Sequence, residues 1–308
     1  MSDSFINQIF NQDCIIGLKM IPSESIDLCI TDPPYNYEFI GHRWDANEVR
    51  RRLDRVTGST STLVKNVPYG SGLAGGKRDA RWYERYRKNL AEYQLWSTEW
   101  ALEVIRVLKP GAFICAFSSN RTVAHIQVAL EEAGFYARDV IVWQKNSGIP
   151  KGLNYSKKLA KEGKDSSEWQ GWHSALRNEW EAIAVLQKPL IDNYSKTIDQ
   201  YGVGLFKAET EGGFASNIIR RIEAESKEKF NVHCTVKPVS LIKYLIELTL
   251  PIDRNRIVLD PFMGSGTTAV AALQLGVNFL GFEIFEEYVE VASKRIERFN
   301  EGNKTSVE

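Results

Sequence analysis

The stretch that decides the fold is residues 256–268, which read Arg-Ile-Val-Leu-Asp-Pro-Phe-Met-Gly-Ser-Gly-Thr-Thr. Its apolar start predicts a buried strand over 256–260, and its glycines predict a tight turn into a helix over 269–274. Gly276 ends that helix, and residues 278–281 predict a second strand that reaches Glu283. The pattern is a βαβ unit with Gly-x-Gly-x-x-Ala at its turn and an acid about twenty residues after Asp260.

A βαβ unit of this kind is typical of a nucleoside-cofactor site. The glycines let the cofactor approach the backbone, and the acid accepts hydrogen bonds from ribose hydroxyls. NAD fits this pattern as well as other nucleoside cofactors do. A phosphate-binding P-loop is excluded because no lysine follows the second glycine. The spacing to Glu283 argues against a turn with packing duties alone.

A second informative stretch is residues 31–36, Thr-Asp-Pro-Pro-Tyr-Asn. The apolar run 26–30 before it predicts a buried strand that enters a rigid turn. The two prolines fix φ and remove two backbone donors, which leaves the Asp32 carboxylate and the Pro33 carbonyl as acceptors beside the Tyr35 ring. This arrangement suits a planar ring that carries an amino group. A simple strand-ending turn is the alternative, since Asp and Pro are common in turns.

Strands and helices alternate along much of the chain. This predicts an α/β fold with a doubly wound, mostly parallel sheet. The expected elements are a strand over 5–10, a short helix, the strand 26–30, a helix over 97–108 capped by Ser97, a strand over 112–117, a helix over 121–133 and a strand over 138–143.

Composition excludes several classes of protein. Lys plus Arg and Asp plus Glu both number 39, so no overall charge indicates a polyanion partner. The four cysteines lack Cys-x-x-Cys spacing, and we expect no metal site or disulfide. The sequence shows no signal pattern and no apolar run of membrane-spanning length, so a cytoplasmic location without membrane contact is expected.

Two segments interrupt the alternation. Residues 37–90 are basic and glycine-rich, and a connection this long favours a DNA-contacting arm or lid over a floppy surface insertion. Residues 146–230 predict an inserted recognition region, in which 181–187 returns to the main sheet. The residues expected to contact DNA are Arg43, Trp44, Arg50, Arg51, Lys145 and Lys151.

The two motifs together resemble those of the amino-group DNA methyltransferases that use S-adenosylmethionine. Asp32-Pro33-Pro34-Tyr35 resembles their catalytic motif, and residues 260–268 resemble their cofactor motif. Residues 233–238, with the helix expected over 240–250, resemble the segment around the methionine end of the cofactor. Catalytic motif first and cofactor motif last is the order of the family's β group. The resemblance implies a Rossmann-like sheet of seven strands, one of them antiparallel, with double-stranded DNA as the substrate.

The resemblance also implies roles for individual residues. Asp32, Pro33, Pro34 and Tyr35 would be catalytic, with Asp32 near the cofactor as well. Glu283 would bind the ribose, Asp13 and Cys14 would lie beside the adenine moiety, and Thr235 and Lys237 would hold the amino-acid end. The cofactor loop would contribute Asp260, Pro261, Phe262, Gly264, Ser265, Gly266, Thr267 and Thr268.

The expected domains are a methyltransferase domain from 1–36, 91–145 and 231–308, the insertion 37–90 and the recognition region 146–230.

Asp before Pro-Pro-Tyr is usual in the family's adenine-N6 enzymes, so adenine N6 is favoured over cytosine N4. An NAD-linked oxidoreductase would leave 31–36 unexplained, and a DNA-binding module without catalysis would not need Asp32. Two further substrates stay possible, RNA and a protein glutamine. The sequence also allows a homodimer and a cognate restriction endonuclease as partner.

Overall fold

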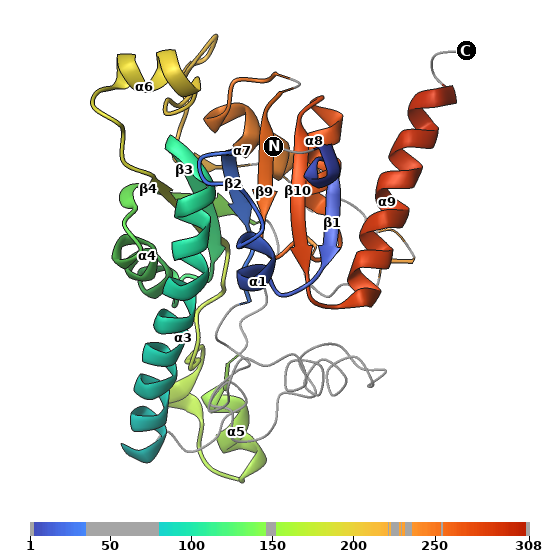
Figure 1. Ribbon diagram of the computed structural model, residues 1–308. Helices are drawn as coiled ribbons and strands as arrows, with labels where there is room; N and C mark the ends of the chain where they lie inside the picture. The colour runs from blue at the N-terminus through green and yellow to red at the C-terminus, as the bar shows by residue number, and fades with distance from the viewer. Residues whose placement is uncertain are drawn as a thin grey trace.

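The computed structural model describes residues 3–34, 80–145, 152–220, 222, 228, 230–231, 236–253 and 255–305. In these ranges eight strands form one sheet in the order β1-β10-β9-β2-β3-β5-β4-β8 (Figure 1). All neighbours are parallel except at β5, which runs antiparallel to β3 and to β4. The strands are β1 (Gln8–Asn11), β2 (Ile26–Thr31), β3 (Leu108–Ser118), β4 (Tyr136–Gln144), β5 (Trp180–Gln187), β8 (Ile218–Ile219), β9 (Ile257–Asp260) and β10 (Asn278–Glu283).

This sheet confirms the expected doubly wound α/β fold with one antiparallel strand. The two-residue β8 adds an edge strand to the seven that the resemblance implied. A separate hairpin, β6 (Glu209–Thr210) with β7 (Gly213–Phe214), lies outside the sheet.

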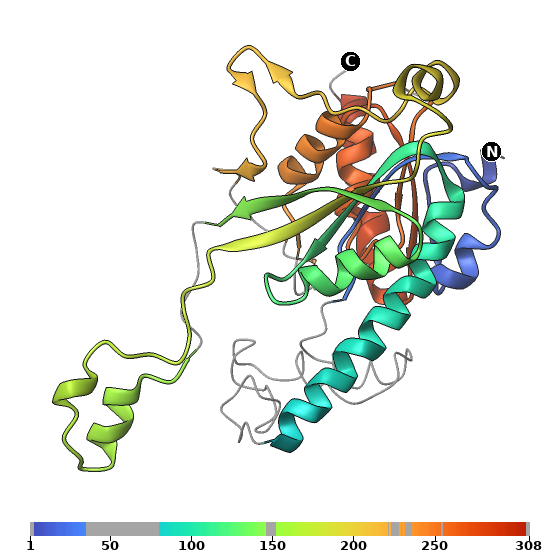
Figure 2. The same ribbon diagram turned by 90° about the vertical axis from the view of Figure 1, so that its left-hand side faces the viewer.

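Helices cover both faces of the sheet (Figure 2). On one face α3 (Ala80–Val107) packs against α1 (Cys14–Leu18) and α4 (Val123–Glu132). On the other face α8 (Thr267–Gln274) packs between α7 (Val239–Thr249) and α9 (Glu286–Thr305). Among the helices of the described ranges, none is both long and apolar enough to cross a membrane.

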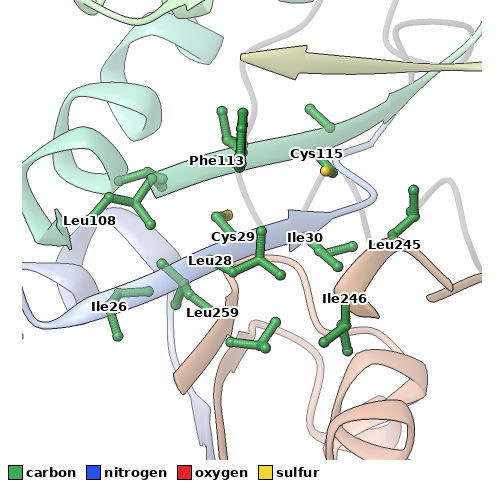
Figure 3. Close-up of a cluster of buried hydrophobic side chains, with 14 of the residues drawn as sticks. Ile26, Leu28, Cys29, Ile30, Leu108, Phe113, Cys115, Leu245, Ile246 and Leu259 are labelled. Atoms are coloured by element: carbon green, nitrogen blue, oxygen red, sulfur yellow. The ribbon is translucent and has the colours of Figure 1, made fainter. Parts of the chain in front are cut away.

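The centre of the core is β2, which is buried at every residue. A parallel strand covered on both faces reads as a continuous apolar run, and 26–30 is such a run apart from Asp27. Figure 3 shows Ile26, Leu28 and Ile30 of β2 among buried side chains of β3, β9 and α7. The rigid centre of the molecule therefore leads directly into the turn at Asp32.

Some element boundaries differ from those expected. Ser97 does not cap a helix: it is fully buried inside α3, which begins at Ala80 because residues 80–96 contain neither glycine nor proline. The boundary we expected at residue 90 therefore falls within a helix. The first strand is β1 at Gln8–Asn11, preceded by the 3-10 turn η1 (Asp3–Phe5), and it does not begin at residue 5.

The described part of the region 146–230 divides into two structural parts. Residues 152–179 form a lobe with α5 (Tyr155–Lys161) and η2 (Ser167–Trp169), which projects beyond the ends of β4 and β5 (Figure 2). Residues 188–220, with α6 (Tyr194–Tyr201), pack back on the sheet, where Phe206 stacks on Phe113 with ring centroids 4.4 Å apart. β5 lies between these two parts as an interior strand of the main sheet.

The buried Asp27 carboxylate ties together the amino ends of three strands. One oxygen accepts from Lys109 Nζ at 2.6 Å and from an Arg256 guanidinium nitrogen at 2.9 Å. The other oxygen accepts from the backbone N–H of Ile257 at 2.9 Å. These residues belong to β2, β3 and the start of β9, so the bonds join the three strands. The negative charge of Asp27 is compensated by the two cations although the carboxylate is buried.

Asp27→Ala should destabilise the fold. The change leaves two partly buried cations and a buried N–H without their acceptor, which costs about 3 kcal/mol of unfolding free energy. Chemical denaturation measures that loss. Asp199→Ala, at an exposed position of α6, is the control and should change stability by less than about 0.5 kcal/mol. Equal stability of the two variants would contradict the assigned role of Asp27.

Candidate active site

The candidate site lies where three parallel strands end. Asp32 follows β2, Asp260 ends β9 and Glu283 ends β10. From β9 the chain continues to β10 on one side, and from β2 it continues to β3 on the other side, so the strand order reverses between β9 and β2. Open α/β sheets bind their ligands at such a reversal, outside the carboxyl ends of the strands.

The Asp260 carboxylate organises the turn after β9. One of its oxygens accepts from Thr31 Oγ1 at 2.9 Å and from the Phe262 N–H at 3.0 Å. The other accepts from Thr268 Oγ1 at 2.7 Å. Burial raises the pKa of Asp260 to about 6, and these donors oppose the rise. Asp260 and Thr268 thus bond to each other and to β2 in this structure.

The glycine-rich turn depends on left-handed backbone. Gly264 has φ of 52° and Gly266 has φ of 80°. A Cβ on Gly266 would lie 2.7 Å from the Cβ and 3.0 Å from the Cα of Ala292 in α9. Gly266 is therefore required both by conformation and by the close approach of α9.

Arg295 of α9 supports the same turn, and we did not predict it from the sequence. Its guanidinium donates to the Ser265 carbonyl and to Thr267 Oγ1, both at 2.9 Å, and to Glu228 at 2.8 Å. Helical spacing could have identified it, because it places Arg295 on the same buried face of α9 as Tyr288, Val291 and Ala292. A charged residue on a buried face needs a polar partner.

Glu283 joins the turn to β10 and lies next to the start of α1. Its two carboxylate oxygens accept from the N–H groups of Gly264 at 2.8 Å and Phe285 at 2.9 Å. Burial raises its pKa to about 7. Its backbone carbonyl accepts from the N–H of Gln12 at 3.0 Å, which brings Asp13 to the same edge.

Asp13 and Cys14 occupy the first turn of α1. The Asp13 carboxylate caps the helix by accepting from the N–H groups of Ile15 at 2.9 Å and Ile16 at 3.2 Å. Cys14 is buried, and burial raises the pKa of its thiol well above the ordinary value, so it remains a neutral apolar contact. The structure thus brings together Asp13, Cys14, Glu283 and the glycine-rich turn.

Asp32 pairs with Lys237. One carboxylate oxygen, Oδ2, accepts from Lys237 Nζ, whereas the buried Oδ1 has no hydrogen-bond partner within the described residues. Lys237 itself is 9% exposed and lies 3.6 Å from Glu181 of β5 and 5.1 Å from the centre of the Phe117 ring. Burial lowers the pKa of Lys237, but the carboxylates of Asp32 and Glu181 raise it more, and the net shift is upward. Lys237 is therefore charged.

Lys145, expected to contact DNA, forms an ion pair with Glu181 and lies 5.4 Å from the centre of the Trp143 ring. Its charge is thus directed toward the site. Neither Glu181 nor this pairing was predicted from the sequence.

The inner face of α3 closes one side of the site. The rings of Trp96 and Trp100 each lie 5.5 Å from the Phe262 ring. Tyr93 and Ser97 continue this face and are fully buried. Burial raises the pKa of the Tyr93 phenol, and the Asp32 charge adds to that rise. Aromatic contacts from α3 therefore fix Phe262 against the end of β9.

Several predicted residues lie outside the described residues. They are Tyr35, Arg43, Trp44, Arg50, Arg51, Lys151 and Thr235.

A family model described as DNA methylase matches residues 26–294. The chain belongs to the N6/N4 DNA methylase family. The resemblance seen in the sequence is thereby confirmed, and the protein is a DNA methyltransferase of this family.

Individual relatives span nearly the whole chain. The type II methyltransferase M.HindIII of Haemophilus influenzae is 30% identical over 307 residues, which cover 94% of this chain and 95% of the relative. M.HinfI, from the same species, is 26% identical over 297 residues and is covered to 69% of its own length.

Solved structures share the fold. The crystal structure of the M1.HpyAVI–SAM complex matches with a TM-score of 0.55 at 21% identity, over 94% of this chain and 98% of that one. The PvuII DNA methyltransferase, described as cytosine-N4-specific, matches with a TM-score of 0.57 at 16% identity. The match covers 96% of this chain and 90% of the PvuII enzyme. These matches agree with the Rossmann-like α/β fold.

The raised pKa of Glu283 predicts a pH-dependent stability. Between its unfolded pKa near 4.5 and its folded pKa of about 7, the folded protein keeps a proton that the unfolded chain releases. The folded state thus binds more protons, and this group's contribution to stability falls as pH rises through that window, by about 3 kcal/mol in total.

Glu283→Gln removes this titration. The unfolding free energy of the variant relative to wild type should therefore increase from pH 4.5 to pH 7, as measured by denaturant titration at each pH. Glu287→Gln, in the exposed first turn of α9, should follow wild type throughout. A constant difference between Glu283→Gln and wild type would contradict the assigned pKa.

Proposed function

We propose that the protein transfers the methyl group of S-adenosylmethionine to the exocyclic N6 of adenine at a specific site in double-stranded DNA. The observation that carries this proposal is the Asp32 carboxylate. Its Oδ2 is bonded by Lys237, and its Oδ1 is a buried acceptor without a hydrogen-bond partner in the described part of the chain, directly before Pro33 and Pro34. An amino group with two hydrogens to donate would satisfy that acceptor.

The residues around the glycine-rich turn, together with Lys237, fit the cofactor. Glu283 can accept from ribose hydroxyls, Cys14 and Phe262 offer apolar contacts for an adenine ring, and Lys237 carries the positive charge that an amino-acid carboxylate requires. Gly264, with its left-handed backbone, lets a ligand approach the turn closely. S-adenosylmethionine supplies the electrophilic methyl group, which is carried on a sulfonium.

Asp32 has two tasks in this reaction. The exocyclic nitrogen is a poor nucleophile because its lone pair is delocalised into the ring. By accepting one amino hydrogen on Oδ1, while the Pro33 carbonyl accepts the other, Asp32 favours a tetrahedral nitrogen and localises that pair. Its negative charge then stabilises the positive charge that develops on nitrogen. After the nitrogen–carbon bond forms and the carbon–sulfur bond breaks, the extra proton leaves the nitrogen for Asp32 or water.

The projecting lobe, residues 152–179, is our proposed target-recognition element. It extends from the carboxyl end of β4 (Figure 2), and because β4 runs in the same direction as β2, this is the edge of the sheet at which Asp32 follows β2. Its Trp172 is 60% and its Leu176 92% exposed, and α5 carries Lys157, Lys158 and Lys161. Exposed rings can contact bases and lysines can contact phosphates, so this surface suits DNA from which the target base has been flipped.

Adenine is favoured over cytosine because an Asp stands before the Pro-Pro pair, as is usual in adenine enzymes of the family. The fold does not discriminate between the bases, since the cytosine-N4-specific PvuII enzyme shares it. Digestion of DNA methylated by the protein, followed by mass spectrometry of the nucleosides, should yield 6-methyladenine. Detection of 4-methylcytosine alone would refute the adenine assignment and leave the role of Asp32 intact.

Asp32→Ala should abolish methyl transfer, because it removes the amino-group acceptor. We expect at least a tenfold loss of turnover, which is about 1.4 kcal/mol or more in the barrier. Incorporation of labelled methyl groups into DNA measures it, and calorimetry should find that S-adenosylmethionine still binds. Asp192→Ala, an exposed acid that pairs with Lys196, is the control and should retain wild-type turnover. Turnover above a tenth of wild type in Asp32→Ala would refute the role.

A further inference from the structure

Four alternating charges connect Asp32, at the end of β2, to Lys145, at the end of β4. Asp32 pairs with Lys237, Lys237 lies 3.6 Å from Glu181 Oε2, and Glu181 Oε1 pairs with Lys145. The four side chains come from the ends of β2 and β4, the start of β5 and the segment before α7. None of their side chains is more than 25% exposed, so solvent screens these charges only weakly.

Lys237 is held between two acids, and this placement decides which Asp32 oxygen it occupies. Its ammonium bonds Oδ2 and leaves Oδ1 as a buried acceptor. An ammonium has three donors and could also approach Oδ1 if Asp32 were its one anionic neighbour. Glu181 attracts the same ammonium from β5, and the Phe117 ring lies 5.1 Å from it, so Asp32 is not its one anionic neighbour.

Charge balance supports the same conclusion. Asp32, Lys237, Glu181 and Lys145 together carry no net charge. Without the Glu181 charge, the group would carry an excess positive charge beside the nitrogen that becomes positive during methyl transfer. That excess would raise the barrier, because catalytic sites stabilise charge as it develops.

We propose that Glu181 is a positioning residue for methyl transfer: it holds Lys237 on Oδ2 of Asp32 and so keeps Oδ1 available to the target amino group. This inference rests on the proposed function, since it assigns Glu181 a role through Asp32. Glu181 acts on another residue and need not touch the base or the cofactor. It should therefore affect the rate of the chemical step when both ligands are saturating.

The test uses Glu181→Gln, which keeps the size of the side chain and removes its charge. With saturating S-adenosylmethionine and DNA, the single-turnover rate of methyl transfer should fall about tenfold or more. The dissociation constant for DNA should stay within about twofold of wild type. Glu131→Gln is the matched control: this glutamate is exposed on α4, outside the candidate site and the projecting lobe, and its loss should leave rate and affinity unchanged.

Two results would overturn the proposal. One is a wild-type single-turnover rate in folded Glu181→Gln. The other is weaker S-adenosylmethionine binding with an unchanged rate at saturation, which would assign Glu181 to cofactor binding. Thermal unfolding reports whether the variant is folded. If it is not, Glu181→Asp decides: it keeps the charge, but its shorter side chain moves the carboxylate away from Lys237, which lies 3.6 Å from it in wild type. A rate at least threefold below wild type is expected, and an unchanged rate overturns the proposal.

The same assays separate this inference from the proposed function. If wild type and Glu131→Gln methylate DNA, the proposed function holds whatever Glu181→Gln does. If no variant transfers a methyl group from S-adenosylmethionine to DNA, and wild type fails as well, the proposed function itself is wrong.

Discussion

The hydrogen bonds of the buried Asp260 carboxylate are the interaction on which the site depends. They join Thr31 at the end of β2 to Phe262 and Thr268 in the turn after β9. A carboxylate is tolerated in such a dry position only when its oxygens are bonded, so the two strand ends cannot separate without exposing an unsatisfied acid. Because Asp32 is the next residue after Thr31, the same bonds fix the distance between the acid at the end of β2 and the glycine-rich turn. This is the preorganisation that a methyl transfer site requires.

The two ends of β2 show how one residue type serves structure and function. At the amino end, both oxygens of Asp27 are engaged, by Lys109, Arg256 and a backbone N–H. At the carboxyl end, Asp32 has one oxygen engaged by Lys237 and one buried oxygen without a hydrogen-bond partner in the described residues. A buried acid whose two oxygens are both hydrogen-bonded stabilises the fold. A buried acid with one oxygen that lacks a hydrogen bond is a candidate for binding a ligand.

The C-terminal helix α9 also helps to form the site. Arg295 reaches the Ser265 carbonyl and Thr267 in the glycine-rich turn, and it pairs with Glu228, which precedes the segment of Lys237 in the chain. The close approach that this requires is possible because Gly266 has no Cβ to meet Ala292. The last helix thus also holds the turn in place, in addition to the bonds of Asp260.

The sequence by itself determined the features that depend on local backbone chemistry. Glycines at 264 and 266 predict left-handed turn backbone, two prolines predict a rigid turn after Asp32, and apolar runs predict the strands that lead into both. Together they identify the family and the fold. Only the tertiary structure decided that Lys237 bonds Asp32 and that Glu181 lies beside Lys237. The physical reason is that an ion pair between distant residues leaves no periodic or compositional trace in the chain: its partners meet only because the order of strands in the sheet brings their ends together.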